Sequence, residues 1–305
     1  MSVSGSGGVG SGPSTKRKGI NLLLDEVARA TVRLADAGVA SPRADAEELA
    51  AAVHGVRRGE LHTVPDSAFD ARFWEYVARR EAGEPLQHIT GRAFFRYLEL
   101  KVGPGVFIPR PETEVMVGWV LDTLHEMDVY DPLVVDLGTG SAAIALSIAL
   151  EAPRARVHAV EKDPTAFVHA TRNVEELDER GRVRLHLGDF ATALKELDGT
   201  VDLVVSNPPY IPMSEWEHVP PDVRDHDPAD ALWGGGEDGL DAIRVVERTA
   251  RRLLRPGGYV AVEHSDRQGN AVYWIFAEEN GWRDVRNRRD LTDRDRFVTA
   301  RLAGD

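Results

Sequence analysis

Hydrophobic side chains in the first third of the chain recur at helical spacing. Between residues 20 and 84 they fall three or four positions apart, first in a stretch that Gly38 ends. The pattern resumes after Ser41-Pro42, a pair that suits a helix N-cap and first helical residue. A third stretch begins near Asp66-Ser67 and has one stripe made of Phe69, Phe73, Tyr76, Val77 and Arg80. We predict a small all-α domain over residues 20–84, with this stripe in its core.

After Pro85 the pattern is typical of strands. Residues 93–102 are rich in strand-forming side chains, Gly103-Pro104-Gly105 suits a turn, and residues 106–108 suit a returning strand. We therefore predict a linker over residues 85–110 that contains a β-hairpin.

From residue 133 onward, short apolar strands alternate with helical stretches. The predicted strands are residues 133–137, 156–160, 183–187, 201–205 and 259–263, and the predicted helices are residues 142–150, 165–177 and 240–254. Strands that are each followed by a helix favour a parallel sheet covered on both faces. Residues 111–305 are thus predicted to form one large α/β domain.

Composition narrows the function classes. The 305 residues are 42% hydrophobic and 29% charged, as in ordinary globular proteins, and no apolar run approaches the length of a membrane span. A net charge of -13 argues against a protein that binds the phosphate backbone of nucleic acid. The lack of cysteine excludes disulfides, thiolate zinc sites and a cysteine nucleophile. Residues 1–19 are rich in Gly and Ser and lack the apolar core of a secretory signal, so we predict a disordered tail there.

Three polar motifs stand at the carboxyl ends of successive predicted strands, where open α/β sheets bind ligands. The first is Asp136-Leu137-Gly138-Thr139-Gly140, whose glycines permit a sharp turn and a close ligand approach. Glu161, about 20 residues further on, suits ribose hydroxyls. Asp189 suits the exocyclic amine of adenine, and Phe190 suits its ring. Each alone also fits an ordinary turn or a solvated strand end, but together they predict a nucleoside cofactor.

The segment Asn207-Pro208-Pro209-Tyr210, called here the acceptor segment, follows the fourth predicted strand. The Asn207 side-chain oxygen and the Pro208 carbonyl can accept hydrogen bonds from a planar amide or amine nitrogen. The prolines fix that geometry, and Tyr210 offers a flat face. Such orientation suits in-line methyl transfer to a nitrogen with a delocalised lone pair. The structural alternative is a Pro-Pro turn that ends a strand.

The motif at residues 136–140 and the acceptor segment resemble those of class I methyltransferases that modify amide or exocyclic nitrogens. Three further segments resemble the HemK/PrmC family of peptide chain release factor N5-glutamine methyltransferases: residues 107–114 (FIPRPETE), residues 231–240 (ALWGGGEDGL) and residues 289–296 (RDLTDRDR). The resemblance covers nearly the whole chain from residue 20.

The resemblance implies a Rossmann-like, seven-stranded methyltransferase sheet with S-adenosylmethionine as cofactor. Its implied substrate is the Gly-Gly-Gln glutamine of release factors, which the helical domain would help to dock. It implies that Phe107 lies near the cofactor, that Pro109 and Pro209 contact substrate, and that Asn207, Pro208 and Tyr210 are catalytic, with Asn207 also near the cofactor. We expect a cytoplasmic monomer that binds no metal, membrane or nucleic acid directly.

This chain departs from the family pattern at two places. Ala142 stands where the family usually has glycine, and we expect its methyl group to crowd the helix start or the cofactor and to weaken cofactor binding. Glu263-His264-Ser265 stands where the family tends to have Glu-Ile-Gly, and we interpret His264 as a strand-end residue without a catalytic part. Arg110 and Glu112 suit either an interdomain salt bridge or direct contact with ligand.

Two other functions remain as alternatives. A nucleic-acid adenine or cytosine N-methyltransferase uses a similar acceptor segment, but it must also extract a base and hold the strand. The chain shows no target-recognition domain, and the arginines between residues 283 and 289 are interleaved with acids. A non-catalytic relative that only binds S-adenosylmethionine is suggested by Ala142 alone, and the intact acceptor segment argues against it. His218 and His226 lie among acids without a diagnostic metal-ligand spacing.

Overall fold

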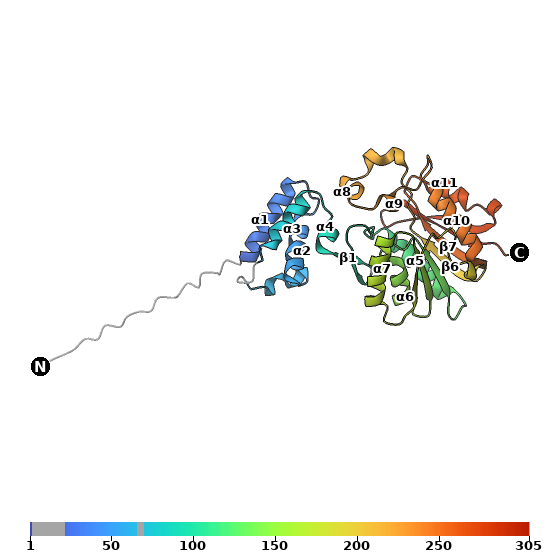
Figure 1. Ribbon diagram of the computed structural model, residues 1–305, viewed down its shortest axis with the longest axis horizontal. Coiled ribbons are helices and arrows are strands. Elements are labelled where there is room, and N and C mark those ends of the chain that lie inside the picture. The colour runs from blue at the N-terminus through green and yellow to red at the C-terminus, as the bar shows by residue number, and fades with distance from the viewer. Residues whose placement is uncertain (2–21, 66–69, 305) are drawn as a thin grey trace. The chain divides into compact units, whose positions relative to one another are not determined.

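The computed structural model describes Met1, residues 22–65 and residues 70–304 (Figure 1). The chain divides into two compact units, Met1–Glu81 and Ala82–Asp305. The tail predicted over residues 1–19 and the helix start predicted at Asp66-Ser67 lie outside the described residues, apart from Met1. No helix in the described part of the chain is long and apolar enough to cross a membrane.

The first unit is helical, as predicted. Its elements are α1 (Leu22–Asp36), α2 (Pro42–His54), the 3-10 helix η1 (Arg58–Thr63) and α3 (Arg72–Glu81). Apolar side chains spaced three or four positions apart form its core, among them Leu23, Val27, Leu34, Leu49, Phe73 and Val77. The α2–α3 contact includes a largely buried ion pair, in which Arg80 Nε lies 2.8 Å from Asp45 Oδ2.

The second unit opens with α4 (Leu86–Thr90) and an antiparallel hairpin, β1 (Arg92–Phe95) and β2 (Leu98–Lys101). The hairpin was predicted, but its turn was predicted in the wrong place. Residues 103–105 do form a turn, in which the Val106 N–H donates to the Gly103 carbonyl at 3.3 Å, but this turn follows β2, and residues 106–108 form no strand. The chain turns at Arg96, which has a left-handed backbone with φ 51°. Its N–H donates to Glu114 Oε1 at 3.0 Å, and its guanidinium pairs with Glu151 at 2.6 Å. These bonds offset the strain of a left-handed arginine.

Seven strands form the main sheet, in the order β5-β4-β3-β6-β7-β9-β8. Their bounds are β3 Leu133–Leu137, β4 Arg156–Glu161, β5 Val183–Leu187, β6 Val201–Ser206, β7 Leu254–Glu263, β8 Trp282–Arg289 and β9 Asp295–Leu302. The five strands from β5 to β7 run parallel, and β9 is antiparallel to both β7 and β8. The sheet confirms the predicted Rossmann-like fold. β7 begins five residues earlier than predicted because Leu254 already pairs with Val201.

Both faces of the sheet are covered by helices. Alternate strand residues point to opposite faces, so that Val134 joins one core and Val135 the other. α5 (Thr113–Glu126), α6 (Ala143–Glu151), α7 (Pro164–Leu177) and the hairpin pack on the first face. α10 (Asp241–Leu253) and α11 (Gly269–Ile275) pack on the second, and Figure 1 shows α7 and α10 on opposite sides.

Shorter helical turns complete the second unit. They are η3 (Lys195–Leu197), η4 (Met213–His218), α8 (Pro221–Arg224), α9 (Ala229–Leu232) and η5 (Glu278–Asn280). Three of them, η4, α8 and α9, lie in the long connection between β6 and α10, directly after the acceptor segment. This connection is therefore well placed to form a wall of any site at the end of β6.

Candidate active site

A cavity of about 230 Å³ opens at the carboxyl ends of β3, β4 and β6. Most of the predicted site residues line it: Phe107, Pro109, Gly138, Thr139, Gly140, Glu161, Phe190, Asn207, Pro208, Pro209 and Tyr210. β3 and β6 are neighbours in the sheet, with Leu137 opposite Ser206. The glycine loop after β3, residues 138–140, and the acceptor segment after β6 therefore face one cavity.

Backbone hydrogen bonds hold the glycine loop against β4. The N–H groups of Gly138 and Thr139 both donate to the Val160 carbonyl, at 2.9 and 3.0 Å. Gly138 and Gly140 have φ values of 76° and 57°, which glycine adopts without the strain that a side chain would add. The sharp turn that the glycines were predicted to permit is thus present.

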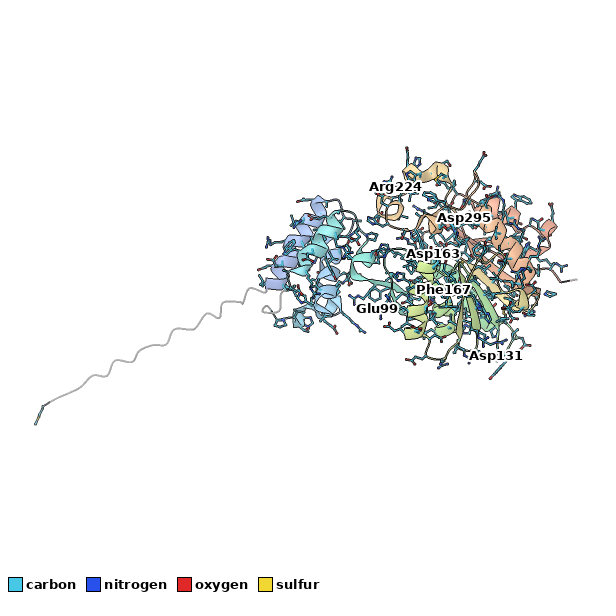
Figure 2. All side chains as sticks on the ribbon, viewed as in Figure 1. Glu99, Asp131, Asp163, Phe167, Arg224 and Asp295 are labelled. Carbon is cyan, nitrogen blue, oxygen red and sulfur yellow. The ribbon has the colours of Figure 1, made fainter. Side chains whose placement is uncertain are left out.

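Glu161 joins the glycine loop to the start of α7. Its Oε2 accepts the Gly140 N–H at 2.8 Å, and its Oε1 accepts the N–H groups of Lys162 and Asp163 at 2.8 and 2.9 Å. Asp163, labelled in Figure 2, then caps α7. A carboxylate has about four acceptor positions. Three are used here, which leaves room on Oε2 for one hydroxyl of a ligand.

Asp136 lies under the glycine loop and is fully buried. Its Oδ2 accepts a hydrogen bond from Thr139 Oγ1 at 2.6 Å, but its Oδ1 has no partner among the described residues. Burial raises the pKa of Asp136 to about 7, against the opposing effect of the Thr139 hydroxyl. Asp136 does not itself line the cavity, so contact between this unpartnered oxygen and a cofactor stays a prediction.

The third cofactor motif is only partly gathered into the cavity. Phe190 lines the wall beside the glycine loop. Asp189 is exposed and does not line the cavity, because its Oδ1 accepts the Ala191 N–H at 2.8 Å and closes a local turn. Contact between Asp189 and an adenine stays a prediction.

Side chains from distant elements orient the acceptor segment. Asn207 Nδ2 donates to Thr113 Oγ1 at 3.2 Å, which leaves Asn207 Oδ1 as the acceptor for a ligand. Tyr210 Oη donates to Glu263 Oε1 at 3.3 Å. Burial, reinforced by the Glu263 charge, raises the pKa of Tyr210 well above its usual value, so its hydroxyl is neutral. Tyr210 therefore presents a flat, uncharged face.

The segment of residues 231–240 supports the backbone of the acceptor segment. Ile211 N–H donates to the Leu232 carbonyl at 2.9 Å, and Gly234 N–H donates to the Ile211 carbonyl at 3.1 Å. A Cβ on Gly234 would overlap the Gly239 carbonyl and lie 2.7 Å from Tyr210 Cα. This close approach explains why glycine stands at position 234.

Three supporting residues were not predicted from the sequence. Gln268 Nε2 donates to the carbonyls of Tyr210 and Asp238, at 2.7 and 2.9 Å. Thr113 belongs to the 107–114 motif, and Glu263 was noticed only as part of a departure from the family pattern. Gln268 has no local pattern that would have revealed it, whereas the position of Thr113 in a motif was a usable signal.

Arg110 holds another wall of the cavity. Its Nη2 donates to Asp227 Oδ2 at 2.6 Å, and its guanidinium lies 5.1 Å from the centre of the Phe107 ring. Burial raises the pKa of Asp227, against the opposing charge of Arg110. This ion pair lies within the second unit and joins Arg110 to the connection after β6. The interdomain salt bridge stays a prediction for Glu112.

His264 is buried and does not line the cavity. Its Nδ1 pairs with the Ser265 carbonyl at 2.8 Å, and its Nε2 pairs with Asn287 Oδ1 at 3.0 Å. Burial lowers the pKa of His264. These contacts agree with its interpretation as a strand-end residue. Across the described residues, no group of three or more histidines and acids could hold a metal ion.

Comparison with known proteins places this geometry in a family. Residues 27–91 match the family model of the PrmC N-terminal domain, and residues 103–218 match that of the methyltransferase small domain. A release factor glutamine methyltransferase of Streptomyces coelicolor is 66% identical over 93% of this chain and 99% of its own length. One of Mycolicibacterium smegmatis is 48% identical over 91% of this chain and 97% of its own.

Solved structures agree on the fold. The catalytic domain of hMettl16 superposes with a TM-score of 0.55, at 16% identity, over 75% of this chain and 82% of its own. At an identity this low, the likeness shows a shared fold and says nothing about the substrate. The identity shared with the curated relatives, over almost their full length, is decisive: the chain belongs to the family of release factor glutamine methyltransferases.

Proposed function

We propose that this protein transfers the methyl group of S-adenosylmethionine to the side-chain amide nitrogen, N5, of the glutamine in the Gly-Gly-Gln motif of peptide chain release factors. The observation that carries the proposal is the shared cavity, in which the glycine loop and the acceptor segment lie together. The names of the relatives supply the substrate class.

The residues present fit S-adenosylmethionine. The unpartnered Oδ1 of Asp136 suits the cationic amino group of the methionine part, and the remaining acceptor position on Glu161 suits a ribose hydroxyl. Phe107 and Phe190 offer apolar faces in the same cavity. The cofactor supplies a methyl group activated by a positively charged sulfur. The protein has to bind it, exclude water and aim the acceptor nitrogen.

The acceptor segment performs that aiming. The lone pair of a glutamine amide is delocalised, so the nitrogen is a poor nucleophile unless its N–H groups are held and its orientation is fixed. Asn207 Oδ1 and the Pro208 carbonyl accept those N–H groups, and Tyr210 supports the amide plane. The acceptor dipoles also stabilise the charge that develops on nitrogen. No base is required before transfer, since the methylated, positively charged nitrogen readily loses a proton to water.

The two units divide the work in this proposal. Residues 20–84 dock the body of the release factor, and residues 111–305 carry the transfer. The hairpin within the predicted linker, residues 85–110, packs on the sheet and so belongs with the second unit. We further propose that the protein acts in the cytoplasm, where its release factor substrates would be found. We propose a monomer because the two domains already cover the hydrophobic surfaces predicted from the sequence.

A labelled-methyl assay tests the proposal. Purified release factor, incubated with the protein and tritiated S-adenosylmethionine, should gain label. A release factor whose Gly-Gly-Gln glutamine is changed to alanine should gain none. Asn207→Ala should lower the rate by about a hundredfold or more, since it removes an acceptor that acts in the transition state. Its affinity for S-adenosylmethionine, measured by calorimetry, should remain close to that of the wild type.

The same assay separates the alternatives. Parallel reactions with total RNA and with DNA test the nucleic-acid hypothesis. Binding of S-adenosylmethionine without label on any substrate would indicate a binding-only relative and would contradict the proposal.

A further inference from the structure

An open groove lies on the first face of the main sheet, at the edge that β8 forms. It has a volume of about 840 Å³ and lies between α5 and the strands β8 and β9. Trp119 and Phe297 give it apolar walls, and the exposed Leu291 also lines it. α11 packs on the second face of the same two strands. The two faces of this edge therefore differ, because one is covered by a helix and the other is open.

The strand register gathers four arginines on the open face. Cross-strand partners lie on the same face of a sheet. Phe297 belongs to the core of the first face, so every second residue of β9 from that point shares its face. The pairs on this face are Arg288 with Phe297, Arg286 with Thr299, and Arg283 with Arg301. Residues 283, 286 and 301 are exposed and residue 288 is half-buried. These four arginines are called here the arginine face.

Acids do not neutralise the arginine face. Within residues 22–65 and 70–304, none of its four guanidinium groups forms an ion pair. The acids that follow β8 in the sequence are used by two other arginines, since Arg289 and Arg296 pair with Asp290, Asp293 and Asp295. The arginine face is therefore a local positive surface on a chain whose net charge is -13.

The groove adds little negative charge of its own. Glu114 and Asp122 line its α5 side, and Glu114 already accepts the Arg96 N–H at 3.0 Å. Burial lowers the pKa of the Arg288 guanidinium, and the charge of Arg286 lowers it further. Two neighbouring cations that repel each other gain from an anionic partner.

The aromatic rings of this face favour a carboxylate partner over nucleic acid. The Arg288 guanidinium lies 5.1 Å from the centre of the Trp119 ring, and that of Arg301 lies 5.3 Å from the centre of the Tyr259 ring. Proteins that bind single-stranded nucleic acid offer free ring faces on which bases stack, whereas guanidinium groups already lie over these rings. A stacked guanidinium still presents the planar fork of N–H donors that matches a carboxylate.

The groove adjoins the active-site cavity at the start of α5. Arg110 and Thr113 line the cavity, while Pro111 and Glu114 line the groove. One turn of chain thus contributes to both. A protein whose glutamine enters the cavity has the arginine face within reach of the surface that surrounds that glutamine.

We propose that the arginine face is a docking surface for an acidic segment of the release factor. The inference rests on the proposed function and adds a contact with the same substrate to the one assigned to the helical domain. The overall charge of -13 repels an acidic partner, and the arginine face provides local attraction next to the cavity. Such complementarity fixes the orientation of the partner and speeds its association.

The primary test is Arg286→Glu in the full-length protein. Arg286 is exposed, and its side chain makes no hydrogen bond to the described residues, so the melting temperature should not change. The KM for release factor should rise about tenfold at low salt, while kcat and the affinity for S-adenosylmethionine stay close to wild type. Added salt should raise the wild-type KM until, at about 0.5 M, it meets that of the variant.

A matched charge reversal at the opposite edge of the sheet is the control. Arg184 lies on β5, is exposed and forms no ion pair with the described residues. Arg184→Glu changes the net charge by the same amount and should leave the KM for release factor within about twofold of wild type. Arg283→Glu, added to Arg286→Glu, should raise the KM further.

A binding measurement gives a readout that does not depend on transfer. Fluorescence anisotropy follows the binding of labelled release factor, with its Gly-Gly-Gln glutamine changed to alanine, and of labelled single-stranded RNA. A KM increase for Arg286→Glu no larger than that for Arg184→Glu would overturn the inference. So would loss of RNA binding with an unchanged KM, which would assign the face to nucleic acid. Failure of the wild type to label release factor would instead sink the proposed function, and the anisotropy arm would still test docking.

Discussion

The two walls of the cavity are held in different ways. The glycine loop takes its side-chain support from Glu161, 21 residues from Gly140, and its backbone bonds from the adjoining strand β4. The acceptor segment depends on Thr113, Glu263 and Gln268, which lie 94, 53 and 58 residues from their partners. A cofactor wall can thus be built within one strand-helix-strand unit. The wall that orients the acceptor also requires the start of α5, the end of β7 and the start of α11.

The sharpest way to break this comparison is Gly234→Ala. Its Cβ would overlap the Gly239 carbonyl and press on Tyr210, so the acceptor wall must move. We expect unfolding free energy to fall by about 3 kcal/mol and transfer to fall by more than about a hundredfold. Chemical denaturation and the labelled-methyl assay measure the two effects. Gly59→Ala is the control, because a Cβ there meets nothing within 4 Å. Equal behaviour of both variants would contradict the supporting role of Gly234.

The pH dependence of cofactor binding sharpens the comparison on the other wall. Because burial raises the pKa of Asp136 to about 7, its ionised form, which a cationic amino group prefers, is populated only above that pH. Affinity for S-adenosylmethionine should rise as pH increases from about 6 to 8, with a proton released on binding near neutral pH. Calorimetry in buffers of different ionisation enthalpy detects that proton.

Asp136→Asn is the matching variant. It should bind S-adenosylmethionine about tenfold more weakly at high pH and lose the pH dependence. In the absence of cofactor, a rise in pH has the opposite effect on the stability of the folded protein from its effect on cofactor affinity. The raised pKa favours the protonated folded state, so the contribution of Asp136 to stability is lost as pH rises through about 7. The variant should therefore gain stability relative to wild type toward high pH, and a constant difference would refute this assignment.

The smallest effect is expected at Ala142. This residue is fully buried at the start of α6 with φ 66°, a left-handed backbone that an L side chain adopts at a cost. Ala142→Gly should therefore raise the unfolding free energy by about 1 kcal/mol, measured by thermal unfolding. The same variant tests the weaker cofactor binding expected from the sequence, because calorimetry would then show a tighter complex. A lower melting temperature would show that the alanine methyl contributes more by packing than its backbone costs.

The sequence was sufficient for features with a local cause. Alternating and continuous apolar runs predicted the bounds of the strands from β3 to β6 to within one residue. Most of these strands are buried, so their limits appear in the sequence as the limits of an apolar run. The hairpin turn was misplaced because Gly103-Pro104-Gly105 is a strong local turn signal. The actual turn at Arg96 is stabilised by Glu114 and Glu151, which lie far along the chain. Gln268 was missed for the same reason, because its function exists only once Tyr210 lies beside it.

The pairing of Leu137 with Ser206 in the sheet has a consequence for the order of folding events. Ser206 Oγ donates to the Leu137 carbonyl at 2.7 Å across a separation of 69 residues, at the point where the two strands lead into the two walls. Closing so long a loop is slow compared with forming a helix or hairpin. A refolding chain therefore acquires its helices before the cavity exists. Recovery of cofactor binding should lag behind recovery of helical circular dichroism. Methyl transfer should return no earlier than cofactor binding, because the acceptor segment also needs the contact between Gln268 and the Tyr210 carbonyl, 58 residues apart.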